Sequence, residues 1–176
     1  MYLKHYNHNH DSLGRFSKSS SLFVSGSSKT QFKDSGYYRK RLPRGVRKEL
    51  KKSIRRKERI NVGDAPGIDR QVQDFLKSKK YDKVHVYGPG KKVRYQADKK
   101  WKTHPIDAPE YEVGSKEWLE KKDIAMERAS TRGLAVVIPE GSSATRKNVE
   151  RLINHNKNVT VYQLSSRSRL LDRKKR

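Results

Sequence analysis

The sequence predicts a three-layer, doubly wound α/β domain with a parallel sheet over residues 21–164. Short β-type runs alternate along the chain with segments of helical periodicity, an order typical of parallel strands joined by right-handed crossovers. The run from Leu134 to Ile138 is apolar without polar alternation, as in a strand covered by helices on both faces. The 176 residues suffice for one domain with tails.

The elements follow one another in a regular order. A strand at 22–24 precedes a basic helix of about residues 43–58, in which Pro43 suits the first turn and Val46, Leu50 and Ile54 recur at helical spacing. Further strands are predicted near Ile60 and at 84–87, 134–138 and 159–162, and further helices at 68–76, 115–130 and 144–154. Residues 91–112 have the least regular pattern.

Both ends of the chain are predicted to be flexible. Residues 1–20 are rich in His, Asn and Ser and form an N-terminal arm, whose histidines we interpret as solvated side chains rather than as a metal site. Residues 165–176 form a basic C-terminal tail. With 32% hydrophobic and 35% charged residues, part of the chain must lie outside a packed core.

The net charge of +24 points to a polyanionic partner, and we expect nucleic acid. Between Arg39 and Arg59, 12 basic residues stand against two acidic ones, and from Arg167 to Arg176 six stand against one. A solvated basic surface without a specific partner is the simpler alternative. The residues assigned to nucleic-acid binding are Arg39, Lys40, Arg41, Arg44, Arg47, Lys48, Lys51, Lys52, Arg55, Arg56, Arg173, Lys174, Lys175 and Arg176.

The composition also limits the setting of the protein. Because the chain has no cysteine, disulfides and thiolate zinc sites are excluded, and the cytoplasm of a host cell or a virion is a compatible location. No segment approaches the roughly 20 apolar residues of a membrane span, so no membrane partner is expected.

Three loops after strands are candidates for ligand binding, since parallel sheets bind ligands beyond the carboxyl ends of their strands. They are residues 26–28, 63–69 and 141–145, which are rich in small and hydroxyl residues that suit a phosphate or ribose. None matches a dinucleotide fingerprint or a Walker loop. Asp64 and Asp69 suit either a ribose hydroxyl or a helix cap, and the Lys122–Asp123 pair suits either a surface ion pair or a phosphate contact.

Residues in these loops resemble the SLOG superfamily, whose Rossmann-like domains bind nucleotides and nucleotide-derived ligands. The similarity lies in Phe23-Val24-Ser25-Gly26-Ser27, in Val62–Asp69 with Val72–Leu76, in Lys122–Met126, and in Gly133-Leu134 with Gly141–Asn148. It covers about residues 21–164. The resemblance and the loops together assign nucleotide binding to Gly26, Ser27, Gly63, Asp64, Gly67, Asp69, Lys122, Asp123, Gly141, Ser142, Ser143, Thr145 and Asn148.

The SLOG superfamily has branches with different functions. Lonely-guy phosphoribohydrolases carry the motif P-G-G-x-G-T-x-x-E. Aligned on Thr145, this chain has Glu140 for the proline, Ser142 for the second glycine, Ala144 for the third and Asn148 for the glutamate. An amide cannot act as a general base, so no catalytic residue is assigned. DNA-processing protein A uses a related fold to hold single-stranded DNA.

We therefore expect a SLOG-like, non-catalytic module that binds a nucleotide and associates with nucleic acid through its basic segments. A short Gly-Arg-Phe pattern at residues 14–16 resembles arms near the ends of phage proteins. One alternative is an enzyme acting on a nucleotide or an ADP-ribose-type signal. Another is a structural or packaged component of a phage virion or nucleoprotein assembly. No metal and no cofactor other than a nucleotide-type ligand are assigned.

Overall fold

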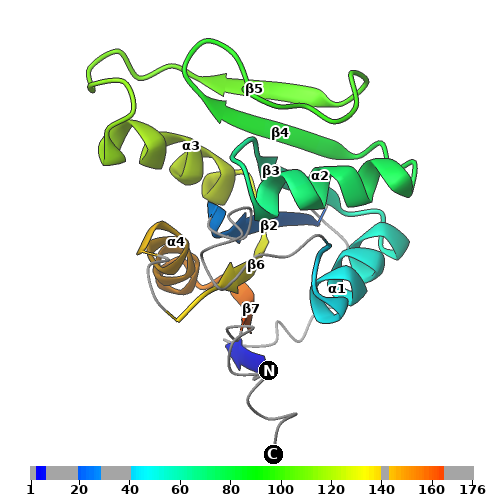
Figure 1. The fold of residues 1–176 in the computed structure, drawn as a ribbon. Coiled ribbons are helices and arrows are strands. Elements are labelled where there is room, and N and C mark those ends of the chain that lie inside the picture. Colours follow the sequence, from blue (N-terminus) through cyan, green and yellow to red (C-terminus); the bar gives the residue numbers. More distant parts are fainter. Residues whose placement is uncertain (1–2, 7–19, 29–40, 140–142, 165–176) are drawn as a thin grey trace, which may run out of the picture.

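The computed structural model describes residues 3–6, 20–28, 41–139 and 143–164. They form a Rossmann-like, three-layer α/β fold, which confirms the predicted fold class (Figure 1). The predicted tail, and the predicted arm except for residues 3–6 and 20, lie outside the described residues. The strands are β1 (Leu3–Tyr6), β2 (Ser21–Gly26), β3 (Arg59–Gly63), β4 (Val84–Pro89), β5 (Lys102–Ile106), β6 (Arg132–Val137) and β7 (Asn158–Gln163); the helices are α1 (Arg44–Arg55), α2 (Ile68–Ser78), α3 (Lys116–Arg128) and α4 (Ser143–Asn154).

The sheet has the strand order β1-β7-β6-β2-β3-β4-β5. All neighbouring strands are parallel except β1, which pairs antiparallel with β7. From β2 the chain builds outward through β3, β4 and β5, and then returns to the other side of β2 to form β6 and β7. The strand order therefore reverses between β2 and β6, and ligands of doubly wound sheets bind beside such a reversal.

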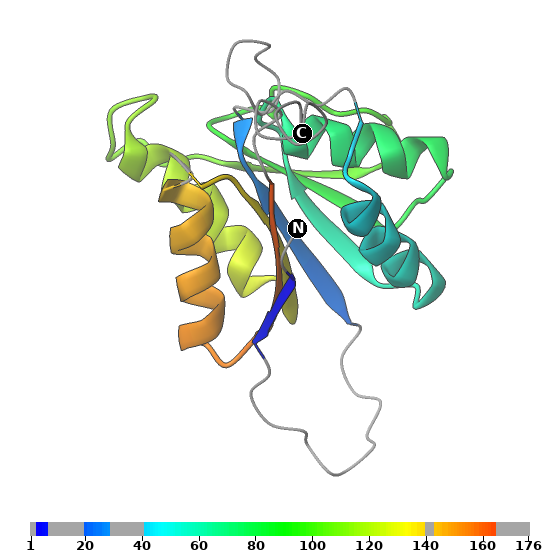
Figure 2. The same cartoon turned by 60° about the horizontal axis from the view of Figure 1, so that its bottom comes forward.

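Two helices cover each face of the sheet (Figure 2). Leu22 and Val24 of β2 pack with α1 and α2 in the larger apolar cluster, whereas Phe23 points to the other face, where it packs with Met126 of α3 and Leu152 of α4. This alternation is the period-two pattern of a strand buried on both faces. The central strands are thereby covered on both faces.

Two strands lie in segments where the sequence pattern predicts none. Residues 3–6 form β1, although we expected a flexible arm there. β5 lies in the irregular segment 91–112 and pairs with β4. As the outer neighbour of β4, β5 exposes Lys102, Thr103 and Pro105, and proline is tolerated on such an edge strand because it needs no ladder donor there. β1 and β5 are the two edge strands of the sheet, and each has only one neighbouring strand. This position accounts for the absence of an apolar run in either sequence.

Buried carboxylates brace the opposite edge of the sheet, at the amino ends of the strands. Glu58 accepts hydrogen bonds from Arg132 Nη2 (2.6 Å) and Ser20 Oγ (3.0 Å). Burial raises the pKa of Glu58, but the bonds from Arg132 and Ser20 outweigh it and hold that pKa below its usual value. Glu127 is held similarly by Lys157. Because each carboxylate is paired, we interpret this edge as structural.

Candidate functional site

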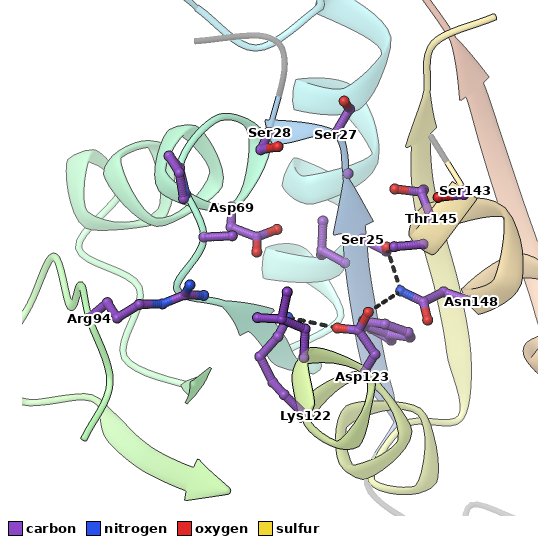
Figure 3. A pocket seen from close by; sticks show the side chains of 17 residues that line it. Ser25, Ser27, Ser28, Asp69, Arg94, Lys122, Asp123, Ser143, Thr145 and Asn148 are labelled. Atoms are coloured by element: carbon purple, nitrogen blue, oxygen red, sulfur yellow. Dashed lines mark hydrogen bonds and ion pairs between the residues drawn. The ribbon is translucent and has the colours of Figure 1, made fainter. Parts of the chain in front are cut away.

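A pocket of about 390 Å³ opens at the carboxyl end of β2, beside the point where the strand order reverses (Figure 3). The loops after β2 and β3, the first turn of α4 and the middle of α3 form most of its wall. The lining residues are Phe23, Val24, Ser25, Gly26, Ser27, Ser28, Ala65, Pro66, Asp69, Arg94, Leu119, Lys122, Asp123, Ser143, Ala144, Thr145 and Asn148.

Most residues assigned to nucleotide binding meet at this pocket. The structure brings together eight of the thirteen: Gly26, Ser27, Asp69, Lys122, Asp123, Ser143, Thr145 and Asn148. Gly63, Asp64 and Gly67 are not lining residues, although they shape the wall from behind. Gly141 and Ser142 lie outside the described residues.

Close contacts leave little room for a side chain at Gly63, the last residue of β3, or at Gly67 in the turn that follows. A Cβ at Gly63 would lie 2.2 Å from Asp69 Oδ2 and 2.9 Å from Lys122 Nζ. Gly67 has a φ of 87°, and a Cβ there would lie 2.7 Å from the carbonyl oxygen of Ser27. The turn therefore packs against the loop after β2 and leaves room for two charged side chains.

Asp69 and Lys122 form a buried, charged centre of the pocket. Asp69 is 5% and Lys122 7% exposed, and Lys122 Nζ forms an ion pair with Asp123 Oδ1 at 2.7 Å. Burial raises the pKa of Asp69 to about 7, although Lys122 acts in the opposite direction. Burial lowers the pKa of Lys122, but Asp123 and Asp69 raise it above its usual value. Neither Asp64 nor Asp69 caps α2, because the N-cap of that helix is Gly67 and it has no side-chain hydrogen bond.

Hydrogen bonds fix the orientation of Asn148 on one wall of the pocket, which we call the α4 wall and define as Ser25, Ser143, Thr145 and Asn148. Arg151 Nη1 donates to Asn148 Oδ1 at 2.7 Å, so the amide nitrogen faces the pocket side. That nitrogen donates to Ser25 Oγ and to Asp123 Oδ2, each at 2.9 Å. Asn148 is thus a brace between α4, β2 and α3, and both of its amide hydrogens are used.

Two hydroxyl groups of this wall are left to face the pocket. Ser25 accepts from Asn148, and its own hydrogen has no acceptor among the described residues. Thr145 is only 4% exposed and lines the pocket, and its hydroxyl also has no partner within the described part of the chain. Thr145 belongs to the first turn of α4, which contains no acidic residue. Figure 3 shows both side chains on the wall opposite Asp69.

The loop 90–101, between β4 and β5, supplies Arg94 to the pocket. Asp64 is fully buried and accepts from the backbone N–H of Arg94 at 2.7 Å and from its Nε at 3.1 Å, and it forms an ion pair with Nη2. This hydrogen bonding raises the pKa of Arg94 despite its burial. A Cβ at Gly88 would lie 2.4 Å from Asp64 Oδ2, so the glycine makes room for the pair.

Gln73 fastens the same loop to α2. Its side chain is fully buried, donates to the Gly63 carbonyl at 2.8 Å and accepts from the Ala97 N–H at 3.0 Å. Replacing Gln73 with alanine should lower the free energy of unfolding by about 2–4 kcal/mol, because it leaves a cavity and two unpaired backbone groups. Urea unfolding measures the change. Lys77→Ala, at an exposed site of the same helix, should change it by less than about 0.5 kcal/mol, and equal losses would contradict the role of Gln73.

Sequence reasoning missed several residues of the wall. Ser25 stands inside a recognised motif, but its role depends on the hydrogen bond from Asn148, which is distant in sequence. Arg94 lies in an irregular basic segment, and nothing in the pattern distinguishes it from Lys91 or Lys92. Leu119 gave no signal either, because it is an apolar residue at helical spacing that is 36% exposed at the pocket.

The outer side of α1 carries a basic stripe, which we define as Arg44, Lys48, Lys51 and Arg55. All four are exposed, and none has an ion-pair partner among the described residues. Their spacing places them on one side of the helix, opposite the buried Val46 and Leu50. Arg41 and Arg56 are also exposed, Arg47 is half-buried, and Lys52 pairs with Glu49. The remaining residues assigned to nucleic acid lie outside the described residues: Arg39, Lys40, Arg173, Lys174, Lys175 and Arg176.

The described residues also lack two kinds of feature. No helix there has both the length and the apolarity needed to cross a membrane, and His, Asp and Glu side chains do not gather there in groups of three or more that could hold a metal ion. Comparison of the sequence with models of protein families and with curated proteins gave no match.

Proposed function

We propose that the protein is a nucleotide-binding module that also associates with nucleic acid through its basic surface. The observation that carries the proposal is the α4 wall, where two buried hydroxyl groups, each with a hydrogen that has no described acceptor, lie beside a helix N-terminus that has no acidic residue. The pocket's position at the strand reversal and the resemblance to the SLOG superfamily support the same ligand class.

The phosphate of the ligand is assigned to the α4 wall. Thr145 and Ser25 each have a hydroxyl hydrogen to donate, and the first N–H groups of α4 lack intrahelical acceptors. A phosphate accepts from such donors and is favoured by the positive end of the helix dipole. Lys122 adds a positive charge nearby.

The sugar is assigned to the centre of the pocket. A carboxyl whose pKa is about 7 can accept from a ribose hydroxyl when ionised, and can donate when protonated. The apolar Leu119 and Pro66 also line the pocket and offer a surface for a base. Sugar, phosphate and base together make a nucleotide a better match than an inorganic anion.

Calorimetric titration with AMP, GMP, CMP and UMP tests this assignment. Wild type should bind at least one of them, and Thr145→Val should weaken that binding about tenfold or more by removing a hydrogen bond to a charged group. The fold should survive, because this hydroxyl has no described partner to lose. Thr103→Val, at an exposed site on β5, should bind as wild type does. Binding by none of the four, or equal binding by Thr145→Val, would remove the basis of the proposal.

A second candidate function is an enzyme acting on a nucleotide or an ADP-ribose-type signal. The observation that favours it is Asp69, because a carboxyl with a pKa near 7 suits general acid and base catalysis. Mass spectrometry after incubation with nucleoside monophosphates, NAD and cyclic nucleotides would detect turnover. A product formed by wild type and not by Asp69→Asn would favour the enzyme over the binding module.

A further inference from the structure

The charged side chains around the pocket form two ion pairs and leave one carboxyl group over. Asp64 pairs with Arg94, and Asp123 pairs with Lys122. Asp69 enters the pocket from the first turn of α2 and forms no ion pair with any described residue. Because each pair sums to zero charge, Asp69 decides the net charge of the five groups. They are neutral together when Asp69 is protonated, and they carry a single negative charge when it is ionised.

Burial makes the ionised form of Asp69 unfavourable. The side chain is 5% exposed, and burial raises its pKa to about 7; Lys122 opposes this shift, and Asp123 and Asp64 add to it. The pKa values of Lys122 and Arg94 lie above their usual values, so both groups stay protonated near neutral pH. No histidine lines the pocket within the described part of the chain. Asp69 therefore gains or loses its proton in a pH range in which these two cations keep theirs.

A bound phosphate acts on the same carboxyl group. Figure 3 shows Asp69 across the pocket from Ser143 and Thr145, on the α4 wall to which the phosphate is assigned. An anion that shares a space of about 390 Å³ with a carboxylate disfavours the ionised form of that carboxylate. A protonated Asp69 also has a hydrogen to donate to a sugar oxygen. Through both effects the ligand and the proton strengthen each other's binding to the protein.

We propose that the pocket binds its nucleotide together with a proton on Asp69, so that acid strengthens binding and alkali releases the ligand. This inference rests on the proposed nucleotide site and adds the way in which that site is regulated. Because the pKa of Asp69 is raised to about 7, the carboxyl group is neutral well below that pH, and the ligand then binds at full affinity. As the pH rises through about 7, a growing share of the protein must first take up a proton, and the affinity falls.

Calorimetric titration of wild type and Asp69→Asn with AMP, GMP, CMP and UMP, at about pH 6 and about pH 8, tests the inference. Asparagine resembles the protonated acid at both pH values. The affinity of Asp69→Asn relative to that of wild type should therefore rise about tenfold from the lower to the higher pH. Protonation of the ligand's own phosphate affects both proteins alike and cancels in this ratio. Asp82→Asn, at an exposed site between α2 and β4, should follow wild type at both pH values.

The heat of binding to wild type gives a reading that needs no variant. Measured at about pH 8 in two buffers of different ionisation enthalpy, it should report the uptake of about one proton per ligand. Nucleotide binding without proton uptake at this pH would overturn the inference while leaving the proposed function intact. A relative affinity of Asp69→Asn that is the same at both pH values would do so as well. Failure of all four mononucleotides to bind at either pH would count against the nucleotide site itself.

Discussion

Replacing the basic stripe of α1 with glutamine should weaken binding to nucleic acid on the order of a hundredfold to a thousandfold at 0.15 M salt. The variant carries Arg44→Gln, Lys48→Gln, Lys51→Gln and Arg55→Gln. Each phosphate contact contributes about 0.9 to the slope of log affinity against log salt, so loss of four contacts should reduce that slope by about 3–4. Glutamine is a good helix former, so α1 should remain folded.

A control variant with the same net charge distinguishes binding at a defined surface from general electrostatic attraction. Lys77, Lys83, Lys99 and Lys100 are exposed, lie outside α1 and have no ion-pair partner among the described residues. Changing these four to glutamine should leave most of the salt slope in place. Fluorescence anisotropy with single- and double-stranded oligonucleotides over a salt series gives both slopes. Equal losses in the two variants would show that the α1 stripe is not a specific contact surface.

Asp69→Asn should make the protein more stable than wild type, and the gain should grow with pH. The pKa of Asp69 rises from 3.8 to about 7 on folding, so the folded state resists ionisation. Wild type therefore loses stability as the pH rises from about 4 to about 7, by about 4 kcal/mol in all. Asparagine resembles the neutral acid and avoids this loss. Urea unfolding should show a gain of about 1–2 kcal/mol at pH 5 and about 4 kcal/mol at pH 8.

The control for this prediction is Asp82→Asn. Asp82 is exposed between α2 and β4, so its substitution should change stability by less than about 0.5 kcal/mol at either pH. If the stability gain of Asp69→Asn is the same at pH 5 and pH 8, the surroundings of Asp69 do not disfavour the ionised form of its carboxyl group. The charged centre of the pocket would then need a different description.

The sequence predicted β6 well because its residues are buried on both sides, and it predicted α1 because the buried residues of that helix recur at helical spacing. The apolar run 134–138 overlaps β6, and the stripe of Val46, Leu50 and Ile54 lies within α1. β5 was missed since an edge strand can be polar and contain Pro105. β1 was missed because a strand of four residues depends on its partner β7 rather than on a pattern of its own.

The site was predicted in outline but not in its contacts. Small residues after strands identify the three loops. The loops are expected to meet because the carboxyl ends of parallel strands share one edge of the sheet. The roles of Asp64 and Asp69 stayed open in the sequence, and the structure separates them: Asp64 pairs with Arg94, whereas Asp69 faces the pocket. Such pairings depend on three-dimensional neighbours that no local pattern encodes.

Native mass spectrometry of the purified protein, with and without added ADP, tests the nucleotide site most directly. Wild type should carry the mass of one nucleotide-type ligand per chain, and Thr145→Val should carry little or none at the same ligand concentration. Thr103→Val should match wild type. A wild-type chain that remains unliganded at millimolar ADP and AMP, or a Thr145→Val chain loaded as fully as wild type, would contradict a nucleotide site in the pocket at the carboxyl end of β2.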